Sequence, residues 1–355
     1  MTSIDLGTDE VLAEVRGRAG VITLNRPKAM NALNQTMVDA LVQVLDQWRD
    51  DDDVAVVLLR GAGERGLCAG GDVVSLYHDA KANGTEGARF WGSEYPLNLA
   101  ISQYPKPYVA IMNGIVLGGG IGVSAHGSHR IVTDDTRVGM PETGIGFVPD
   151  VGGSHLLTHV PGHLGTHLAL TGAHVGAGEA IECGLADVYV PADQIEALVD
   201  ELCTSGDADA VVGVHARPAP AGFTAEHDVI EQVYDHDTVE KILAALDEVD
   251  DDWARDAAKR IRRNSPLALK VTLESLRRAR GQSLAEALDT EFRVSMNMQR
   301  GHDFVEGIRA QLVDKDRNPQ WQPATLEEVG EADVERVFGP VDDDRITELN
   351  LAQQA

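Results

Sequence analysis

Residues 140–153 read MPETGIGFVPDVGG, a segment of apolar, Gly and Pro residues that carries only two carboxylates, Glu142 and Asp150. A proline stands directly before each acid, and proline fixes φ at its own position. Both carboxylates are therefore predicted to lie on rigid turns, where such groups can act as general acid, general base or nucleophile. Two structural alternatives remain. Pro-Glu is also a common helix start, and Asp150 can be a simple cap.

Two glycine clusters precede this segment. Residues 68–72 read CAGGD after an apolar run, and a triple glycine at 118–120 follows a second apolar run. Helix N-termini offer free N–H groups, and glycine lets a ligand approach the backbone closely. Two such N–H groups converging on one oxygen form an oxyanion hole, although each cluster alone is also typical of a turn or a packing contact. Neither cluster forms the G-x-G-x-x-G pattern of dinucleotide-binding proteins.

The order of these motifs resembles that of the crotonase superfamily, the enoyl-CoA hydratase/isomerase family. The resemblance also rests on GVITLNRP at 20–27, NALN at 31–34 and PKPYVA at 105–110. It implies an α/β protein with a crotonase-like ββα spiral core that binds a CoA thioester. Strand and helix patterns alternate to about residue 190 and then give way to helices. We therefore expect the core at residues 1–200 and a mainly helical C-terminal region at 201–355.

Within that superfamily, several segments resemble the 3-hydroxyisobutyryl-CoA hydrolases. They are PETGIGFVPDVGG, SEYPLN at 93–98 and RGHDFVEGIRA at 300–310. A typical hydratase has a second glutamate two positions after its triple glycine, where this chain has Gly122. The resemblance implies hydrolysis of 3-hydroxyisobutyryl-CoA to 3-hydroxyisobutyrate and CoA in valine catabolism. CoA is then part of the substrate, and no separate cofactor or metal is expected.

The resemblance also implies roles for individual residues. The backbone N–H groups of Gly71 and Gly119 would stabilise the oxyanion. Glu142 would be the nucleophile or the general base. Asp150 would be a second acid/base or would bind the substrate hydroxyl, and Glu94 would help to bind the hydroxyacyl end. Two other functions stay open: an enoyl-CoA hydratase or isomerase with a rearranged acid pair, and a non-catalytic CoA-binding protein.

The 355-residue chain has a net charge of −27, which argues against nucleic acid or an anionic membrane as a partner. No apolar run approaches the roughly 18 residues of a membrane span. Because CoA carries negatively charged phosphates, cations near its binding site must offset the negative field of the chain. Arg26, Lys28 and Arg65 are candidates, with ordinary surface charge as the alternative. Three scattered cysteines and an acidic N-terminus without a signal pattern predict a cytoplasmic protein.

Four histidines, at 155, 159, 163 and 167, recur every four residues and could stack on one helix. Pro161-Gly162 would break that helix, so packing and surface roles are favoured over a metal site. Cys68 lacks a basic partner in the sequence and is interpreted as a packing residue rather than a catalytic thiol.

Periodicity predicts a hairpin at 12–24, and turn-forming composition predicts a loop at 204–223. Residues 300–304 are expected to pack near the CoA pocket, and the stretch from 342 onward to be partly frayed.

The apolar face of the amphipathic C-terminal helices must be buried against the core or against a neighbouring chain. Together with the resemblance, it predicts a homo-oligomer, either a trimer or a dimer of trimers. Helical spacing predicts helices at 35–49, 238–246, 254–263, 266–280 and 283–299.

Overall fold

The computed structural model describes residues 2–223 and 226–353. The chain divides into two compact units that are interleaved along the sequence. This division differs from the single boundary expected near residue 200, because two early segments belong with the helical C-terminal part. The first unit comprises Met1–Gly71, Ser93–Val138 and Val175–Gly222, and the second comprises Asp72–Gly92, Gly139–His174 and Phe223–Ala355.

A seven-stranded sheet forms the centre of the first unit, in the order β1-β2-β3-β4-β5-β7-β9. β1, β2 and β3 pair antiparallel, which confirms the predicted hairpin, and the strands from β3 to β9 pair in parallel. The strands are β1 (Thr2–Ile4), β2 (Val11–Arg16), β3 (Ala19–Leu24), β4 (Val56–Gly61), β5 (Tyr108–Met112), β7 (His129–Val132) and β9 (Val188–Tyr189).

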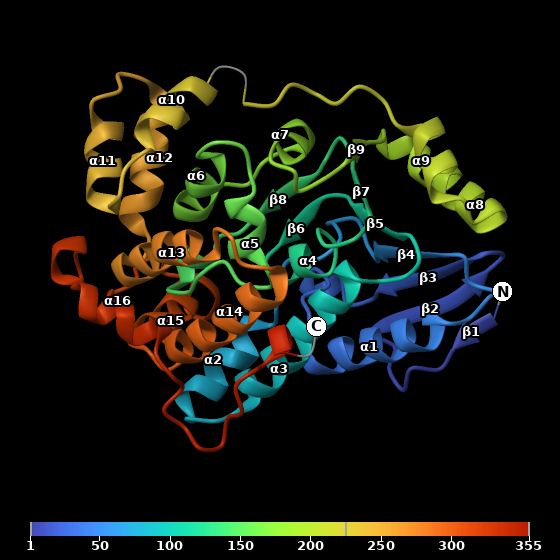
Figure 1. Cartoon of the computed structure of the whole chain (residues 1–355), viewed down its shortest axis with the longest axis horizontal. Coiled ribbons are helices and arrows are strands. Elements are labelled where there is room, and N and C mark those ends of the chain that lie inside the picture. Colours follow the sequence, from blue (N-terminus) through green and yellow to red (C-terminus); the bar gives the residue numbers. More distant parts are fainter. Residues whose placement is uncertain (1, 224–225, 354–355) are drawn as a thin grey trace. The chain divides into compact units, whose positions relative to one another are not determined.

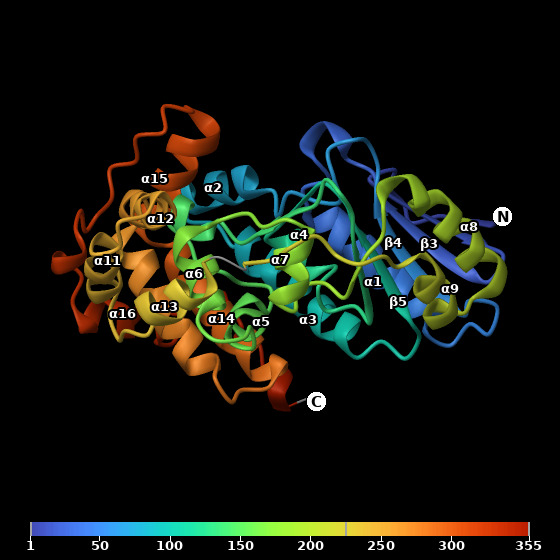
Figure 2. The same cartoon turned by 90° about the horizontal axis from the view of Figure 1, so that it is seen from above.

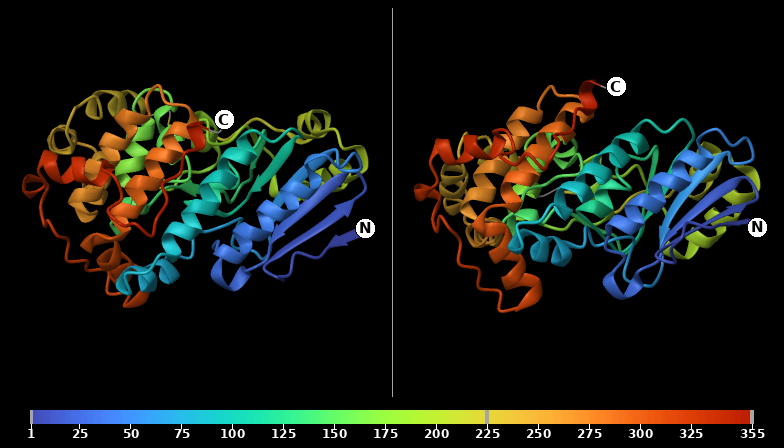
Figure 3. Two further views of the ribbon diagram at one scale, coloured as in Figure 1. Left: turned by 60° about the horizontal axis from the view of Figure 1, so that its bottom comes forward. Right: turned by 90° about the horizontal axis from the view of Figure 1, so that it is seen from below.

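Helices cover both faces of this sheet (Figure 1). On one face lies α1 (Gln35–Arg49), whose Trp48 ring is so close to β3 that a Cβ on Gly20 would lie 2.5 Å from it. On the other face, α8 (Ile195–Ser205) and α9 (Ala208–His215) pack their apolar side chains against alternate residues of β3, β4 and β5. Figure 3 shows α1 beside the first strands from two further sides.

A short second sheet carries the triple glycine. β6 (Ile115–Leu117) pairs with β8 (Arg137–Gly139), and α4 (Gly119–Gly122) begins directly after β6. α7 (Ala177–Glu182) completes the first unit, and α3 (Glu86–Ser102) begins in the second unit and ends in the first.

The second unit is helical. α13 packs against α5 and α6, as Figure 2 shows, and α14 packs against α5 and α15. The helices are α2 (Val73–Lys81), α5 (Gly153–Thr158), α6 (Leu164–Thr171), α10 (His227–Val233), α11 (Val239–Asp247), α12 (Asp252–Arg263), α13 (Pro266–Ala279), α14 (Leu284–Gln299), α15 (His302–Ile308) and α16 (Glu331–Phe338).

Five predicted helices are confirmed, namely α1 and α11 to α14, with ends within about two residues of those expected. Two expectations are wrong. Residues 208–215 form α9 instead of the expected loop, because Asp207 caps the helix and Val211 and Val212 reach the sheet core. Residues 342–353 are docked at Leu351 rather than frayed, since Leu351 is buried and its N–H donates to Asp289 Oδ1 at 2.8 Å. Among the described residues, no helix is long and apolar enough to span a membrane.

Candidate active site

The predicted site residues fall into two groups, one in each compact unit. In the first unit, the structure brings Gly71, Gly119 and Glu94 together. A Cβ placed on Gly119 would lie 3.3 Å from the Gly71 amide nitrogen and 2.7 Å from Glu94 Oε1. A side chain at position 119 would therefore have to displace the Glu94 carboxylate and crowd the Gly71 amide. Cys68 forms a β-bridge with Val116 in β6, which brings the two glycine clusters together. Gly71 forms a second bridge with Leu33.

Neither the Gly71 nor the Gly119 amide donates a hydrogen bond to any other residue of the described chain. Gly119 is the first residue of α4, so its N–H has no acceptor within the helix. Two neighbouring amides with open N–H groups match the donor arrangement of an oxyanion hole. Glu94, from α3, is buried beside them.

Cys68 is buried next to this group, and burial raises the pKa of its thiol to about 12. Its Sγ contacts the Gly70 carbonyl oxygen at 3.5 Å. A thiol with so high a pKa stays protonated at neutral pH and is a poor nucleophile. The structure therefore supports a packing role for Cys68.

In the second unit, Glu142 is the first residue of a 3-10 helix, Glu142–Ile145, with Pro141 at its N-cap. The carboxylate is buried, and its Oε2 accepts no hydrogen bond from any described residue. Burial raises the pKa of Glu142 well above its usual range, and the nearby charge of Asp150 raises it further. The two predicted acids are therefore electrostatic neighbours, and Glu142 is a base of raised strength.

Residues from the C-terminal helices hold the Glu142 helix. Asn264 Nδ2 donates to Thr143 Oγ1 at 3.0 Å, and the Ser265 N–H donates to the Thr143 carbonyl at 3.1 Å. Both contacts hold Thr143, the residue directly after Glu142. None of these partners was identified from the sequence, because they lie more than 100 positions away along the chain.

Asp150 is buried and opens a tight turn in which its carbonyl accepts the Gly153 N–H at 2.6 Å. Val151, the next residue, has φ of 53°, and Gly152 has φ of 81°. A left-handed conformation is unfavourable for a β-branched residue and costs on the order of 1–3 kcal/mol, so the surroundings must hold it in place. Such strained residues cluster at active sites.

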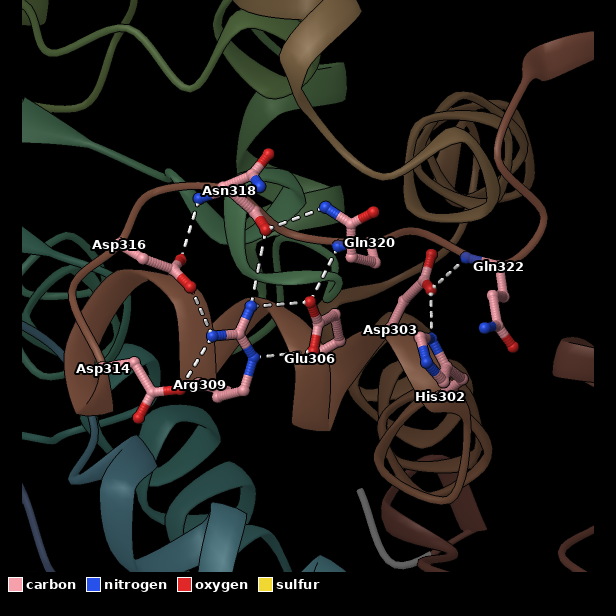
Figure 4. Close-up of polar contacts among 9 residues, drawn as sticks. All are labelled: His302, Asp303, Glu306, Arg309, Asp314, Asp316, Asn318, Gln320 and Gln322. Atoms are coloured by element: carbon pink, nitrogen blue, oxygen red, sulfur yellow. Dashed lines mark hydrogen bonds and ion pairs between the residues drawn. The ribbon is translucent and has the colours of Figure 1, made fainter.

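The segment at 300–304 packs on this same unit (Figure 4). Asp303 Oδ2 accepts the Ser265 hydroxyl at 2.6 Å, while its Oδ1 contacts His302 and accepts the Gln322 N–H at 2.8 Å. A Cβ on Gly146, just after the Glu142 helix, would lie 2.2 Å from the Asp303 carbonyl oxygen. The segment therefore buttresses the Glu142 turn.

Six residues after Asp303, Arg309 links α15 to the chain that follows it through hydrogen bonds. It donates to Glu306 at 2.8 Å, to Asp314 at 2.7 Å and to Asp316 at 2.6 Å, as Figure 4 shows. Aromatic stacking completes this packing, because Phe147, five residues after Glu142, contacts both Trp91 and Phe304 with ring centroids 5.3 Å away.

The predicted phosphate-binding cations differ in availability. Arg26 donates to Glu10 and to the Ala32 carbonyl, and Arg65 donates to the carbonyls of Pro27 and Lys28. Both arginines therefore hold the loop at 26–32. Lys28 is exposed at the tip of that loop. Lys28 and Arg65 are both exposed, but the Arg65 guanidinium already donates to two carbonyls.

The four regularly spaced histidines do not share one helix. His155 lies on α5 with His159 at its C-cap, and His167 lies on α6 with His163 at its N-cap. The ring centroids of His155 and His159 are 4.3 Å apart with the planes tilted by 47°, whereas His167 is buried and bonds the Tyr234 hydroxyl at 2.8 Å. The predicted break at Pro161-Gly162 is confirmed. These histidines make packing and hydrogen-bonding contacts.

A sequence profile described as enoyl-CoA hydratase/isomerase matches residues 19–338. The chain belongs to this family. The Rattus norvegicus protein "3-hydroxyisobutyryl-CoA hydrolase, mitochondrial" is 40% identical over 342 residues, which cover 93% of this chain and 89% of that protein. The Arabidopsis thaliana protein "3-hydroxyisobutyryl-CoA hydrolase 1" is 39% identical over 349 residues, 94% of this chain and 92% of that protein.

A solved structure described as a carnitinyl-CoA dehydratase from Mycobacterium thermoresistibile is 53% identical, with a TM-score of 0.92 and coverage of 97% of this chain and 99% of that one. The predicted family and the crotonase-like α/β fold are thus confirmed. An acyl-CoA substrate is consistent with membership of this family. The rat and Arabidopsis proteins are named as hydrolases, whereas the solved structure is described as a dehydratase.

The predicted cytoplasmic location is wrong by these comparisons, because the rat, zebrafish and human relatives are all named mitochondrial. The prediction rested in part on three cysteines, which the structure shows free and buried. Free cysteines indicate only that thiols are kept reduced, so they do not distinguish one reducing compartment from another.

Proposed function

We propose that this protein hydrolyses 3-hydroxyisobutyryl-CoA to 3-hydroxyisobutyrate and CoA, as a step of valine catabolism. The observation that carries this proposal is the buried pair of Glu142 and Asp150, with the pKa of Glu142 raised by burial and by its partner. The position expected for a hydratase's second glutamate is Gly122, the buried last residue of α4, which has no side chain to supply a carboxylate. The names of the rat and Arabidopsis relatives support the same reaction.

In the proposed mechanism, the thioester carbonyl oxygen accepts hydrogen bonds from the Gly71 and Gly119 amides while an oxygen nucleophile attacks its carbon. Losing one such donor typically costs about 3–4 kcal/mol of transition-state stabilisation. Collapse of the tetrahedral intermediate breaks the C–S bond, and the CoA thiolate leaves and takes up a proton. Glu94 helps to bind the hydroxyacyl end.

Glu142 has two possible parts in this scheme. It attacks directly and forms an anhydride that water then cleaves, or it removes a proton from the attacking water. Asp150 supplies the proton to the leaving thiolate or binds the substrate hydroxyl. Incorporation of ¹⁸O from labelled water tests for direct attack. Label in the Glu142 carboxyl after a single turnover shows an anhydride that water cleaves at the Glu142 carbonyl carbon, because the base route labels only the product.

The proposal extends to the substrate's other end and to assembly. Lys28 and Arg26 are proposed to bind a CoA phosphate. Their positive charge would locally offset the negative field of the chain. The protein is proposed to act as a homo-oligomer, a trimer or a dimer of trimers, without a cofactor other than the CoA of its substrate.

The test compares three reactions of the purified protein. Release of free thiol from 3-hydroxyisobutyryl-CoA is measured beside hydration of crotonyl-CoA and dehydration of carnitinyl-CoA, each with and without EDTA. Thiol release that EDTA does not inhibit supports the hydrolase. The second candidate is a hydratase or dehydratase, favoured by the 53% identity to a structure described as a carnitinyl-CoA dehydratase. Efficient turnover of either other substrate without CoA release would establish it instead.

A further inference from the structure

Glu291 is a buried carboxylate in the second unit that the proposed mechanism does not use. It lies on α14 and is 2% exposed. Its Oε2 accepts the Gly152 N–H at 2.6 Å, and its Oε1 accepts both the Ser154 N–H at 2.9 Å and the Ser154 hydroxyl at 2.5 Å. All three donors belong to the turn that Asp150 opens.

That turn needs an external support. It contains Val151 in a left-handed conformation with φ of 53°, which an isolated chain avoids. The Glu291 carboxylate binds the backbone immediately after this strained residue, at Gly152 and again at Ser154. It is therefore placed to keep the turn in its unfavourable conformation.

We propose that Glu291 is a positioning residue, which holds the turn at 150–154 so that the Asp150 carboxylate keeps its place beside Glu142. The inference rests on the proposed role of Asp150 in the reaction. Burial raises the pKa of Glu291 to about 8, against the lowering effect of its hydrogen bonds, and the charge of Asp150 contributes to the rise. The two side chains are thus also electrostatic neighbours.

The geometry requires two acceptor oxygens, because the Gly152 and Ser154 N–H groups each need one. The amide of a glutamine offers one oxygen and one NH₂ group. In Glu291→Gln, one of the two backbone N–H groups would face a second donor, and the turn would lose that support while the side-chain volume is kept.

The first test measures kcat and KM of full-length Glu291→Gln with 3-hydroxyisobutyryl-CoA. We expect kcat to fall at least about tenfold and KM to stay within about threefold, because the reacting geometry is altered while the CoA contacts are not. Glu286→Gln is a matched control on the same helix. Its carboxylate also accepts a serine N–H and hydroxyl, from Ser283, but it caps an exposed helix end. A kcat of Glu291→Gln within about threefold of the Glu286→Gln value would overturn the proposal.

The second test asks whether Glu291 acts through Asp150. In an Asp150→Asn background, Glu291→Gln should lower the remaining single-turnover rate less than about twofold, because the group it positions is already gone. Full additivity of the two effects would show a general structural role instead. If Glu291→Gln does not fold, Ser154→Ala removes one of the three hydrogen bonds. It should lower kcat about threefold at unchanged KM, and wild-type kcat in that variant would overturn the proposal.

Failure of the inference is separable from failure of the proposed function. If the wild-type protein releases no CoA from 3-hydroxyisobutyryl-CoA, the proposed function fails. The ratio of variant to wild type on the substrate that is turned over then still tests the role of Glu291.

Discussion

Glu142 combines burial with a carboxylate oxygen that no described residue hydrogen-bonds. A buried charge without full hydrogen bonding is unfavourable for folding, and such a group is retained where it has chemistry to perform. The raised pKa also makes the ionised form a stronger base than an exposed glutamate. Burial of Glu142 therefore both increases its strength as a base and disfavours folding.

Glu142→Gln should abolish thioester cleavage, because the amide has nearly the same shape but is neither nucleophilic nor basic. The measurement is the rate of free thiol release, with circular dichroism as the check that the variant is folded. Retention of more than about a tenth of the wild-type rate, a loss under roughly 1.4 kcal/mol, would contradict the assigned role.

The same variant should change how stability depends on pH. Since the folded-state pKa of Glu142 lies above its ordinary value of 4.5, the folded protein binds more protons than the unfolded chain between those two values. The free energy of unfolding therefore falls as pH rises through that window. Glu142→Gln removes this contribution, so its urea midpoint should fall less than that of wild type between about pH 5 and about pH 8. Equal slopes in the two proteins would mean that Glu142 ionises normally.

At the scale of elements, α4 begins at Gly119, which lies close to Gly71 and Glu94. In Gly119→Ala, the new methyl group would lie 2.7 Å from Glu94 Oε1 and 3.3 Å from the Gly71 nitrogen. Alanine keeps the backbone N–H, but its methyl group would displace the Glu94 carboxylate and crowd the Gly71 amide. We therefore expect kcat to fall about 100-fold or more, an effect as large as the loss of one oxyanion donor.

The matched control is Gly213→Ala in α9, where a Cβ would have nothing within 4 Å. This variant should keep wild-type activity and gain roughly 0.5–1 kcal/mol of stability, because alanine favours the helix. Wild-type kcat in Gly119→Ala would show that the close approach of Gly119, Gly71 and Glu94 is not required for turnover.

Elements with strong local signals were predictable from the sequence. α1 has the predicted bounds, and α14 begins within one residue of the predicted start, where Ser283 and Glu286 form a capping box. α9 was not predicted, because eight residues between turn-forming segments give too short a periodic pattern. Its helical state depends on apolar packing against the sheet.

The acids and the glycines of the candidate site were identified from sequence motifs, but the groups that hold them were not. Glu291 is 139 positions from Gly152, and its partners are backbone N–H groups that any residue provides. Such a contact has no signature in one sequence. Its burial and its three donors become visible only in three dimensions.

At the scale of the whole molecule, the net charge of −27 opposes association of identical chains. If the protein is the proposed homo-oligomer, its contacts must overcome this repulsion, and salt should help. Light scattering should give a trimer or hexamer at about 0.15 M salt and partial dissociation at about 0.01 M, where the screening length is longer. A monomer at assay concentration and about 0.15 M salt would rule out the oligomer.

The interleaving of the two units has a consequence for synthesis. Residues 72–92 and 139–174 belong to a unit that is complete only once the chain after Phe223 is present. On the ribosome, Glu142 and Asp150 emerge long before Asn264, Ser265 and Glu291, the residues that hold their turns. A nascent chain can thus assemble its glycine pair early, while Glu142 and Asp150 lack these contacts until the last third has been translated. Hydrolytic competence would arise only near the end of translation.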